Sequence, residues 1–251
     1  MKWVFRGCAI ATYIFLYVPI LILAVFSFND ATQAYGWQGF SLRWYRELVH
    51  SSELLLALKN SLIIALASVG LAVSMGTALV WYLADRFPRS VPLFYSVVAI
   101  PEIVLAIGLL TCFSYWSVPL GYTSLIAGHT LLGLGFVVPI VYARLQELDK
   151  RIIEASLDLG ATQTQTLVRI VIPFLSPALI AAAMLVFIVS LDNFLISFFC
   201  VGASFQTLSL YIFAMIRGGV SPVVNALSVI MIMVSSVLVM LFSLFMARAQ
   251  E

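Results

Sequence analysis

Two acidic residues, Glu102 and Asp192, lie inside long apolar stretches of this sequence. An ionisable side chain inside the hydrocarbon core of a membrane costs free energy. Such a residue therefore usually faces a cavity or marks a substrate path. No lysine or arginine lies deep in these stretches, so we predict a path for a positively charged cargo. Pro101 favours the same site, because a proline removes one helical hydrogen bond and frees the carbonyl oxygen of Val97 to accept from an ammonium group. A structural role is the alternative: either acid could pair with a basic residue of a neighbouring subunit, or Glu102 could be protonated.

The sequence lacks the patterns of several common catalytic and metal sites. None of its lysines follows a glycine, which excludes a nucleotide-binding P-loop. The two histidines, His50 and His129, are too far apart for a His-Glu-x-x-His zinc site, and His129 is expected to be a packing or hydrogen-bonded residue. The 3 cysteines are widely spaced, and the net charge of +2 comes without a basic run. We therefore expect no catalytic residue, no metal and no nucleic-acid partner.

The polar segment 147–177 has the pattern of two short helices. Two apolar residues four positions apart would form one stripe of the first helix, and two acidic residues would form an adjacent polar stripe. The stripes consist of Ile153 with Leu157 and of Glu154 with Asp158. Gly160 is expected to end this helix, and Pro173 is expected to close the next. Such a pair of helices would form a protrusion that a cytoplasmic partner could bind.

These candidate sites require elements that cross a bilayer. Of the 251 residues, 63% are hydrophobic and 10% are charged, whereas soluble domains carry about 25% charged residues. A helix needs roughly 20 mostly apolar residues to cross a membrane. We predict an all-α integral membrane protein, a single transmembrane domain over residues 1–251 with six transmembrane helices. The spans are approximately 8–28, 58–83, 92–115, 123–146, 178–201 and 224–247.

The distribution of basic residues predicts the orientation of these spans. Nine of the 13 lysines and arginines fall on the face that carries both termini. Because short cytoplasmic loops collect positive charge, both termini are expected in the cytoplasm. The loop 29–57 then lies outside and the loop 147–177 inside. In the outer loop, Ser41 is a possible N-cap of a short surface helix, and Trp44 could stack on a cationic ligand or anchor the interface.

The inner loop contains a pattern of about 20 positions: Glu154-Ala155-Ser156, Gly160 four residues later, and Ile170-x-Ile172-Pro173. It resembles the EAA loop of binding-protein-dependent ABC importer permeases, with two conservative departures, Ser156 for alanine and Ile172 for leucine. In that family the loop forms a coupling helix that docks on the ATPase subunit. The resemblance implies an ATPase-coupling role for Glu154, Ala155, Ser156, Leu157, Asp158, Leu159 and Gly160.

Other stretches resemble the second permease subunit of spermidine/putrescine importers. They are Trp44-Tyr45, Pro101-Glu102-Ile103-Val104, Ser190-Leu191-Asp192-Asn193 and 219–227. The resemblance implies the type I ABC importer permease fold in a bacterial cytoplasmic (inner) membrane, surrounded by lipid. It implies a substrate path that includes Trp44, Glu102, Asp192 and Asn193. Since the family has aspartate at the first acidic position and two acids at the second, Glu102 and Asn193 leave this chain fewer carboxyl groups and leave the exact amine open.

The same resemblance implies partner proteins. They are a homologous second permease subunit, two ATPase subunits and an extracytoplasmic solute-binding protein. ATP and Mg would be bound by the ATPase subunits, so no cofactor is expected in this chain. Transport would proceed by alternating access, which needs only rigid-body motion of the helices.

Three other functions account for parts of this sequence. An importer permease for an anion or a metal chelate should carry basic or hydroxyl-rich positions in its cavity. A secondary transporter could use the acids as proton sites, but such folds usually show paired internal repeats and lack an amphipathic inner loop. An intramembrane serine hydrolase would need a serine facing His129 and a glycine-flanked serine motif, which the sequence lacks.

Overall fold

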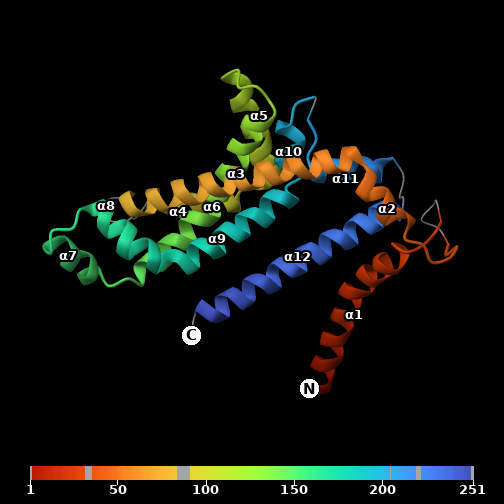
Figure 1. Ribbon diagram of the computed structural model, residues 1–251, viewed down its shortest axis with the longest axis horizontal. Coiled ribbons are helices and arrows are strands. Elements are labelled where there is room, and N and C mark those ends of the chain that lie inside the picture. The colour runs from red at the N-terminus through yellow and green to blue at the C-terminus, as the bar shows by residue number, and fades with distance from the viewer. Residues whose placement is uncertain (1, 32–35, 84–90, 204, 219–221, 250–251) are drawn as a thin grey trace. The chain divides into compact units, whose positions relative to one another are not determined.

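The computed structural model describes residues 2–31, 36–83, 91–203, 205–218 and 222–249 (Figure 1). Regular structure in these ranges is helical, apart from one isolated antiparallel bridge between Asn29 and Phe40. The all-α prediction is therefore confirmed for the described part of the chain. Two basic residues that supported the predicted orientation, Arg86 and Arg89, lie outside the described residues.

Contacts divide the chain into two compact units, residues 1–55 with 211–251 and residues 56–210. The helices of the first unit are α1 (Lys2–Phe26), α2 (Arg43–His50), most of α11 (Leu208–Arg217) and α12 (Pro222–Ala249). Both α1 and α2 contact α12. The expectation that Ser41 is the N-cap of the short surface helix was wrong, because α2 has Leu42 at this position. The Ser41 hydroxyl nevertheless accepts from the Arg43 N–H at 3.1 Å.

The second unit holds most of α3 and the helices as far as α10. Its elements are α3 (Ser52–Leu83), α4 (Val91–Ala99), α5 (Glu102–Tyr115), α6 (Tyr122–Gln146), α7 (Lys150–Asp158), α8 (Gln163–Thr166), the π-helical turn η1 (Leu167–Val171), α9 (Ile172–Asp192) and α10 (Leu195–Cys200). Helix α6 runs through the core and packs against α4 and α9. Gly133 of α6 makes this packing close, because an added Cβ would lie 2.9 Å from atoms of both Ala72 and Val186.

Helix α9 connects two parts of this unit that matter for function. It follows η1, α8 and α7 at its beginning and leads to α10 at its end, and α7 and α10 lie far apart along the unit (Figure 1). With 21 residues, α9 is about 30 Å long. Its inner face packs on α6 through Leu175, Ala182 and Val186.

Several described helices can cross a membrane by length and composition. Four pass this test alone, at Phe5–Phe26, Ser52–Tyr82, Tyr122–Gln146 and Gln163–Asp192. The pair α4 and α5 would make a fifth, although the two helices are bent by 109° at their break. The multi-pass membrane fold is thus supported, and the number six stays a prediction. In α12 the stretch Pro222–Val237 qualifies as a shorter apolar helix.

Two predicted spans were wrong in their continuity. The span 92–115 is interrupted at Ile100–Pro101, where proline cannot supply the backbone N–H that a continuous helix requires. The span 178–201 begins earlier, with α9, and stops at Asp192. Asn193 then adopts an extended backbone with φ −65° and ψ 109°, and α10 starts only at Leu195. Both interruptions lie at the predicted acidic positions.

Candidate functional site

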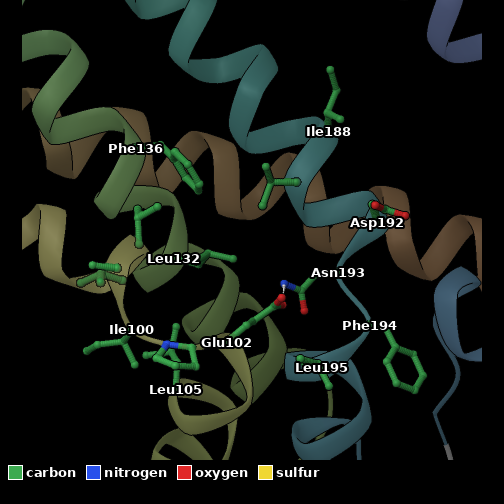
Figure 2. A pocket seen from close by; sticks show the side chains of 15 residues that line it. Ile100, Glu102, Leu105, Leu132, Phe136, Ile188, Asp192, Asn193, Phe194 and Leu195 are labelled. Carbon is green, nitrogen blue, oxygen red and sulfur yellow. Dashed lines mark hydrogen bonds between the residues drawn. The ribbon is translucent and has the colours of Figure 1, made fainter. Parts of the chain in front are cut away.

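A cavity of about 610 Å³ lies between the two interrupted helices of the second unit (Figure 2). The α4–α5 break forms one side, the α9–α10 break forms another, and α6 contributes two apolar residues. The lining consists of Val97, Val98, Ala99, Ile100, Pro101, Glu102, Leu105, Leu132, Phe136, Ile188, Val189, Asp192, Asn193, Phe194 and Leu195. The structure thus brings together Glu102, Asp192 and Asn193, three of the four residues predicted for the substrate path.

Glu102 is placed by the break at Pro101. Helix α4 closes with the Ile100 N–H donating to the Ser96 carbonyl at 2.9 Å, and α5 begins at Glu102. The side chain of Glu102 is half-buried. A carboxylate at the first residue of a helix is stabilised by the positive end of the helix dipole. The fold therefore places the Glu102 side chain at the cavity wall, at the N-terminal end of α5.

Asp192 occupies the opposite kind of position. It is the last residue of α9, its side chain is exposed, and its carboxylate is turned away from Glu102 in Figure 2. The carbonyl groups of a last helical turn carry partial negative charge, so the end of α9 adds to the negative potential around Asp192. Within the described part of the chain, the carboxylate of Asp192 has no hydrogen-bond or ion-pair partner. A cation near this point would be stabilised both by the carboxylate and by the helix end.

Asn193 joins the two breaks. Its Nδ2 donates to Glu102 Oε1 at 2.5 Å (Figure 2). Its Oδ1 accepts from the Ile196 N–H at 3.0 Å. The second bond caps the start of α10 from the residue before its N-cap position, Phe194, because an asparagine oxygen can satisfy an N–H of the first helical turn. Asn193 is only 5% exposed, so these bonds fix a side chain that water hardly reaches.

The cavity lining is acidic and otherwise mostly apolar. Its 15 residues include two carboxylates and no lysine or arginine. Both α4 and α9 end at the cavity, and helix C-termini favour cations. Leu132, Phe136 and Ile188 supply apolar wall. This arrangement is suited to a ligand that combines positive charge with hydrocarbon.

A second polar contact holds α9 against α6 near the cavity. His129 Nδ1 and Ser190 Oγ are 2.6 Å apart, and both residues are buried. No described residue bonds to Nε2 of His129. The prediction that His129 is a hydrogen-bonded residue is confirmed, and its partner lies two positions before Asp192.

Trp44, the fourth residue of the predicted path, belongs to the first unit. Its indole N–H donates to the Asn29 carbonyl at 2.7 Å, and the ring is buried. The Arg43 guanidinium lies 4.8 Å from the ring centroid, so a cation of the chain itself already lies over this ring. These contacts give Trp44 a role in holding the outer loop, and its stacking on a ligand stays a prediction.

The predicted inner loop forms an elbow of two short helices, α7 and α8. Asp149 caps α7 by accepting from the Arg151 N–H at 3.0 Å. At the other end, Gly160 has φ +85°, and its N–H donates to the Leu157 carbonyl while the Ala161 N–H donates to the Ser156 carbonyl. This pair of bonds is the Schellman motif, in which a glycine takes the left-handed conformation. The prediction that Gly160 ends the first helix is confirmed.

The outer surface of the elbow is available to a partner. No residue of α7 is fully buried, and Glu154, Ala155, Leu157, Asp158 and Leu159 are exposed. A second cavity of about 610 Å³ opens here, with apolar and basic residues in its wall. Its lining consists of Arg151, Ile152, Ala155, Ser156, Leu159, Ala161, Gln165, Arg169 and Ile170. Of the predicted apolar stripe, Ile153 packs against the core formed by α3, α6 and α9, whereas Leu157 is exposed.

The prediction that Pro173 closes the second short helix was wrong. The chain continues from α8 through η1 into α9, and the Ile172 N–H donates to the Leu167 carbonyl as in a π-helix. Pro173 lies in the first turn of α9, where a missing N–H is tolerated. The elbow is therefore continuous with the helix that ends at Asp192.

Four residues outside the predicted sites help to hold the elbow, namely Thr166, Arg144, Glu147 and Phe174. Thr166 is buried and shares a hydrogen bond of 3.0 Å with Ser156, which ties α8 to α7. Arg144, at the end of α6, forms an ion pair with Glu147 and lies 4.3 Å from the ring centroid of Phe174. A local signal existed only for α8, where Thr162 and Gln165 form a capping box.

The fold and its two sites define a class of protein: a multi-pass helical membrane component with an acidic cavity and an exposed elbow at the two ends of one helix. The chain belongs to the family described as binding-protein-dependent transport system inner membrane components, which matches residues 68–250. The predicted family is therefore confirmed. The chain is a transport component rather than an enzyme.

Similar proteins and structures agree with this assignment. The spermidine/putrescine transport system permease protein PotC of Escherichia coli (strain K12) is 39% identical over 237 residues, 93% of this chain and 90% of that protein. The putrescine transport system permease protein PotI of the same organism is 32% identical over 250 residues, 95% of this chain and 89% of that protein. A crystal structure of a bacterial ABC transporter involved in the import of the acidic polysaccharide alginate has a TM-score of 0.73 at 14% identity, with 95% of each chain covered. That last likeness shows the fold alone.

Proposed function

We propose that this chain is the membrane-spanning permease subunit of an ATP-binding-cassette importer whose cargo is a polyamine. The observation that carries the proposal is the cavity between the two helix breaks, with Glu102 and Asp192 and no basic residue among its lining. PotC and PotI, whose names specify spermidine and putrescine, support the same cargo.

The cavity matches the chemistry of polyamines in two respects. A polyamine consists of ammonium groups separated by methylene chains. The carboxylates and the C-terminal ends of α4 and α9 favour the ammonium groups, while Leu132, Phe136 and Ile188 can contact the methylene groups. An anionic cargo would meet repulsion from the same groups, since the low dielectric of a membrane protein strengthens charge interactions.

We infer six spans, with both termini in the cytoplasm of a bacterial inner membrane and lipid around them. The broken pair α4–α5 counts as one span in this arrangement. Helix α12 counts as another, because its 28 residues give a length of about 42 Å, enough to cross a bilayer. The acidic cavity would then lie along the path, and the elbow would face the cytoplasm.

The proposed assembly contains a homologous second permease subunit, two ATPase subunits and an extracytoplasmic solute-binding protein. The ATPase subunits bind ATP and Mg. They also bind the elbow at Glu154, Ala155, Ser156, Leu157, Asp158, Leu159 and Gly160. Exposure of α7 supports this role. Movement of the elbow would be carried by α9 to Asp192, which lies about 30 Å away at the other end of the helix. Rocking of the packed helices then gives alternating access.

Uptake by the complete transporter tests the cargo. The assembly would be reconstituted in liposomes with its receptor, and radiolabelled putrescine and spermidine would be supplied outside. Glu102→Gln and Asp192→Asn should each lower uptake about tenfold or more, because each removes a charge-assisted contact. Glu53→Gln, which changes an exposed acid in the first turn of α3, is the matched control and should leave uptake unchanged. Wild-type uptake by both cavity variants would refute the cation path.

The same preparation separates this function from its rivals. An importer of this class consumes ATP during uptake and stops when ATP is withheld. A secondary transporter would continue without ATP and would stop when the ion gradient is dissipated. Uptake of an anion or a metal chelate in preference to both polyamines would assign another cargo within the same family.

A further inference from the structure

The amide of Asn193 has little freedom to turn. Its Oδ1 is engaged by the Ile196 N–H, and its main-chain carbonyl accepts from Ser209 Oγ at 3.0 Å. With the oxygen committed to the start of α10, only the NH₂ group can point to Glu102, which it reaches at 2.5 Å. Burial to 5% exposure protects these bonds from competition by water. Asn193 is therefore fixed to the start of α10 and to the first turn of α11, and it presents a neutral donor to the acid.

We propose that Asn193 is the positioning residue of the acidic cavity and not one more ligand of the cargo. Its amide holds one carboxylate oxygen of Glu102, so that the carboxylate stays aimed at the cavity and keeps only part of its acceptor capacity for an ammonium group. The inference rests on the proposed function, since it assigns the residue that controls Glu102 during cation transport.

Such a partner serves release as well as binding. A transported ion must be bound well enough to enter a site and weakly enough to leave it. A carboxylate with all its acceptor positions free would hold an ammonium group strongly in a site of low dielectric. The Asn193 NH₂ group satisfies part of Glu102 without adding charge. It also keeps the Glu102 rotamer fixed when the cation departs.

The geometry predicts that the carboxylate and the amide can be swapped between positions 102 and 193. In the double variant Glu102→Gln/Asn193→Asp, the glutamine amide can donate to the new carboxylate at position 193. The second oxygen of that carboxylate can still accept from the Ile196 N–H, so the cap of α10 is kept. The cavity retains the same net charge and the same number of hydrogen bonds. In Asn193→Asp alone, two carboxylates face each other at hydrogen-bond distance, because Glu102 is one methylene longer than the aspartate that the family has at this position.

The test is uptake of radiolabelled putrescine by the complete transporter in liposomes, with insertion and ATPase association measured for each variant. Both single variants, Glu102→Gln and Asn193→Asp, should lower uptake about tenfold. The double variant should recover to within about threefold of wild type; the remaining loss reflects a carboxylate that no longer lies at the positive end of α5. Such recovery is not expected if Asn193 only caps a helix, because Asn193→Asp alone keeps the cap.

Asn193→Ser guards against a general folding defect. A serine can cap α10 but is too short to hold Glu102, so this variant should assemble normally and still lose uptake about tenfold. Full uptake by Asn193→Ser or by Asn193→Asp would overturn the positioning role. A double variant that assembles but transports no better than either single variant would overturn it too, while leaving the cation path intact. Full uptake by Glu102→Gln would remove both the positioning role and the proposed path through Glu102.

Discussion

His129 of α6 and Ser190 of α9 share a buried hydrogen bond of 2.6 Å between Nδ1 and Oγ. This bond lies within the packed α6–α9 pair, two residues before the acidic end of α9. It therefore contributes both to the cohesion of the core and to the placement of Asp192.

Ser190→Ala should lower the free energy of unfolding by about 1–3 kcal/mol, because it leaves a buried imidazole nitrogen without its partner. Thermal unfolding of the purified protein in detergent would measure the loss. Ser176→Ala is the matched control on the same helix: Ser176 bonds only to the Pro173 carbonyl within its own turn, in a more exposed setting. Equal stability of the two variants would contradict a special role for the His129–Ser190 pair.

Gly133→Val should destabilise the second unit by about 1–3 kcal/mol through overpacking. An added Cβ at this position would lie 2.9 Å from Ala72 of α3 and 2.9 Å from Val186 of α9. Neither neighbour can move without shifting its helix. The control is Gly70→Ala on α3, where a Cβ would have no atom within 4 Å. Expression level and thermal unfolding would be compared, and a Gly133→Val protein as stable as Gly70→Ala would show that the helices can separate at little cost.

How much of this structure the sequence could predict depends on how far apart in the sequence the interacting residues lie. The elbow was largely predictable, because Gly160 ends α7 by a local backbone requirement and Thr162 with Gln165 caps α8 by bonds within one turn. The helices at Phe5–Phe26, Ser52–Tyr82 and Tyr122–Gln146 followed from their continuous runs of apolar residues. In these cases the determining residues are close together in the sequence.

The interruption at Asn193 could not be located in the same way. The stretch 178–201 remains strongly apolar on both sides of Asp192 and Asn193, so composition favours one continuous span. The partner that engages the Asn193 side chain, Glu102, is 91 positions away. The 109° bend beside Pro101 is another such case, since a proline predicts a lost hydrogen bond but the packing of α4 on α6 belongs to the tertiary structure.

Gly160→Val should uncouple ATP hydrolysis from uptake. The φ of +85° costs a β-branched residue about 1–2 kcal/mol, and the surrounding space is open, so the effect arises from the backbone and not from a clash. The elbow would change its turn while the spans still insert. Gly160→Asn is the control, because asparagine accepts this conformation more readily. Uptake per ATP hydrolysed would be measured, and equal coupling in both variants would count against the importance of the turn.

Glu154→Lys should weaken binding of the proposed ATPase subunits to the elbow. Glu154 is exposed on α7, and no described residue forms an ion pair with it, so its replacement should leave the fold of this chain unchanged. Reversing a charge at the rim of an interface mainly affects association, and the defect should be sensitive to salt concentration. We expect Glu154→Gln to assemble with nearly normal yield and Glu154→Lys to lose ATPase during purification at low salt. If both variants retain ATPase and uptake, the contact surface lies elsewhere on the elbow, and the hollow beside Arg151 and Arg169 becomes the region to mutate next.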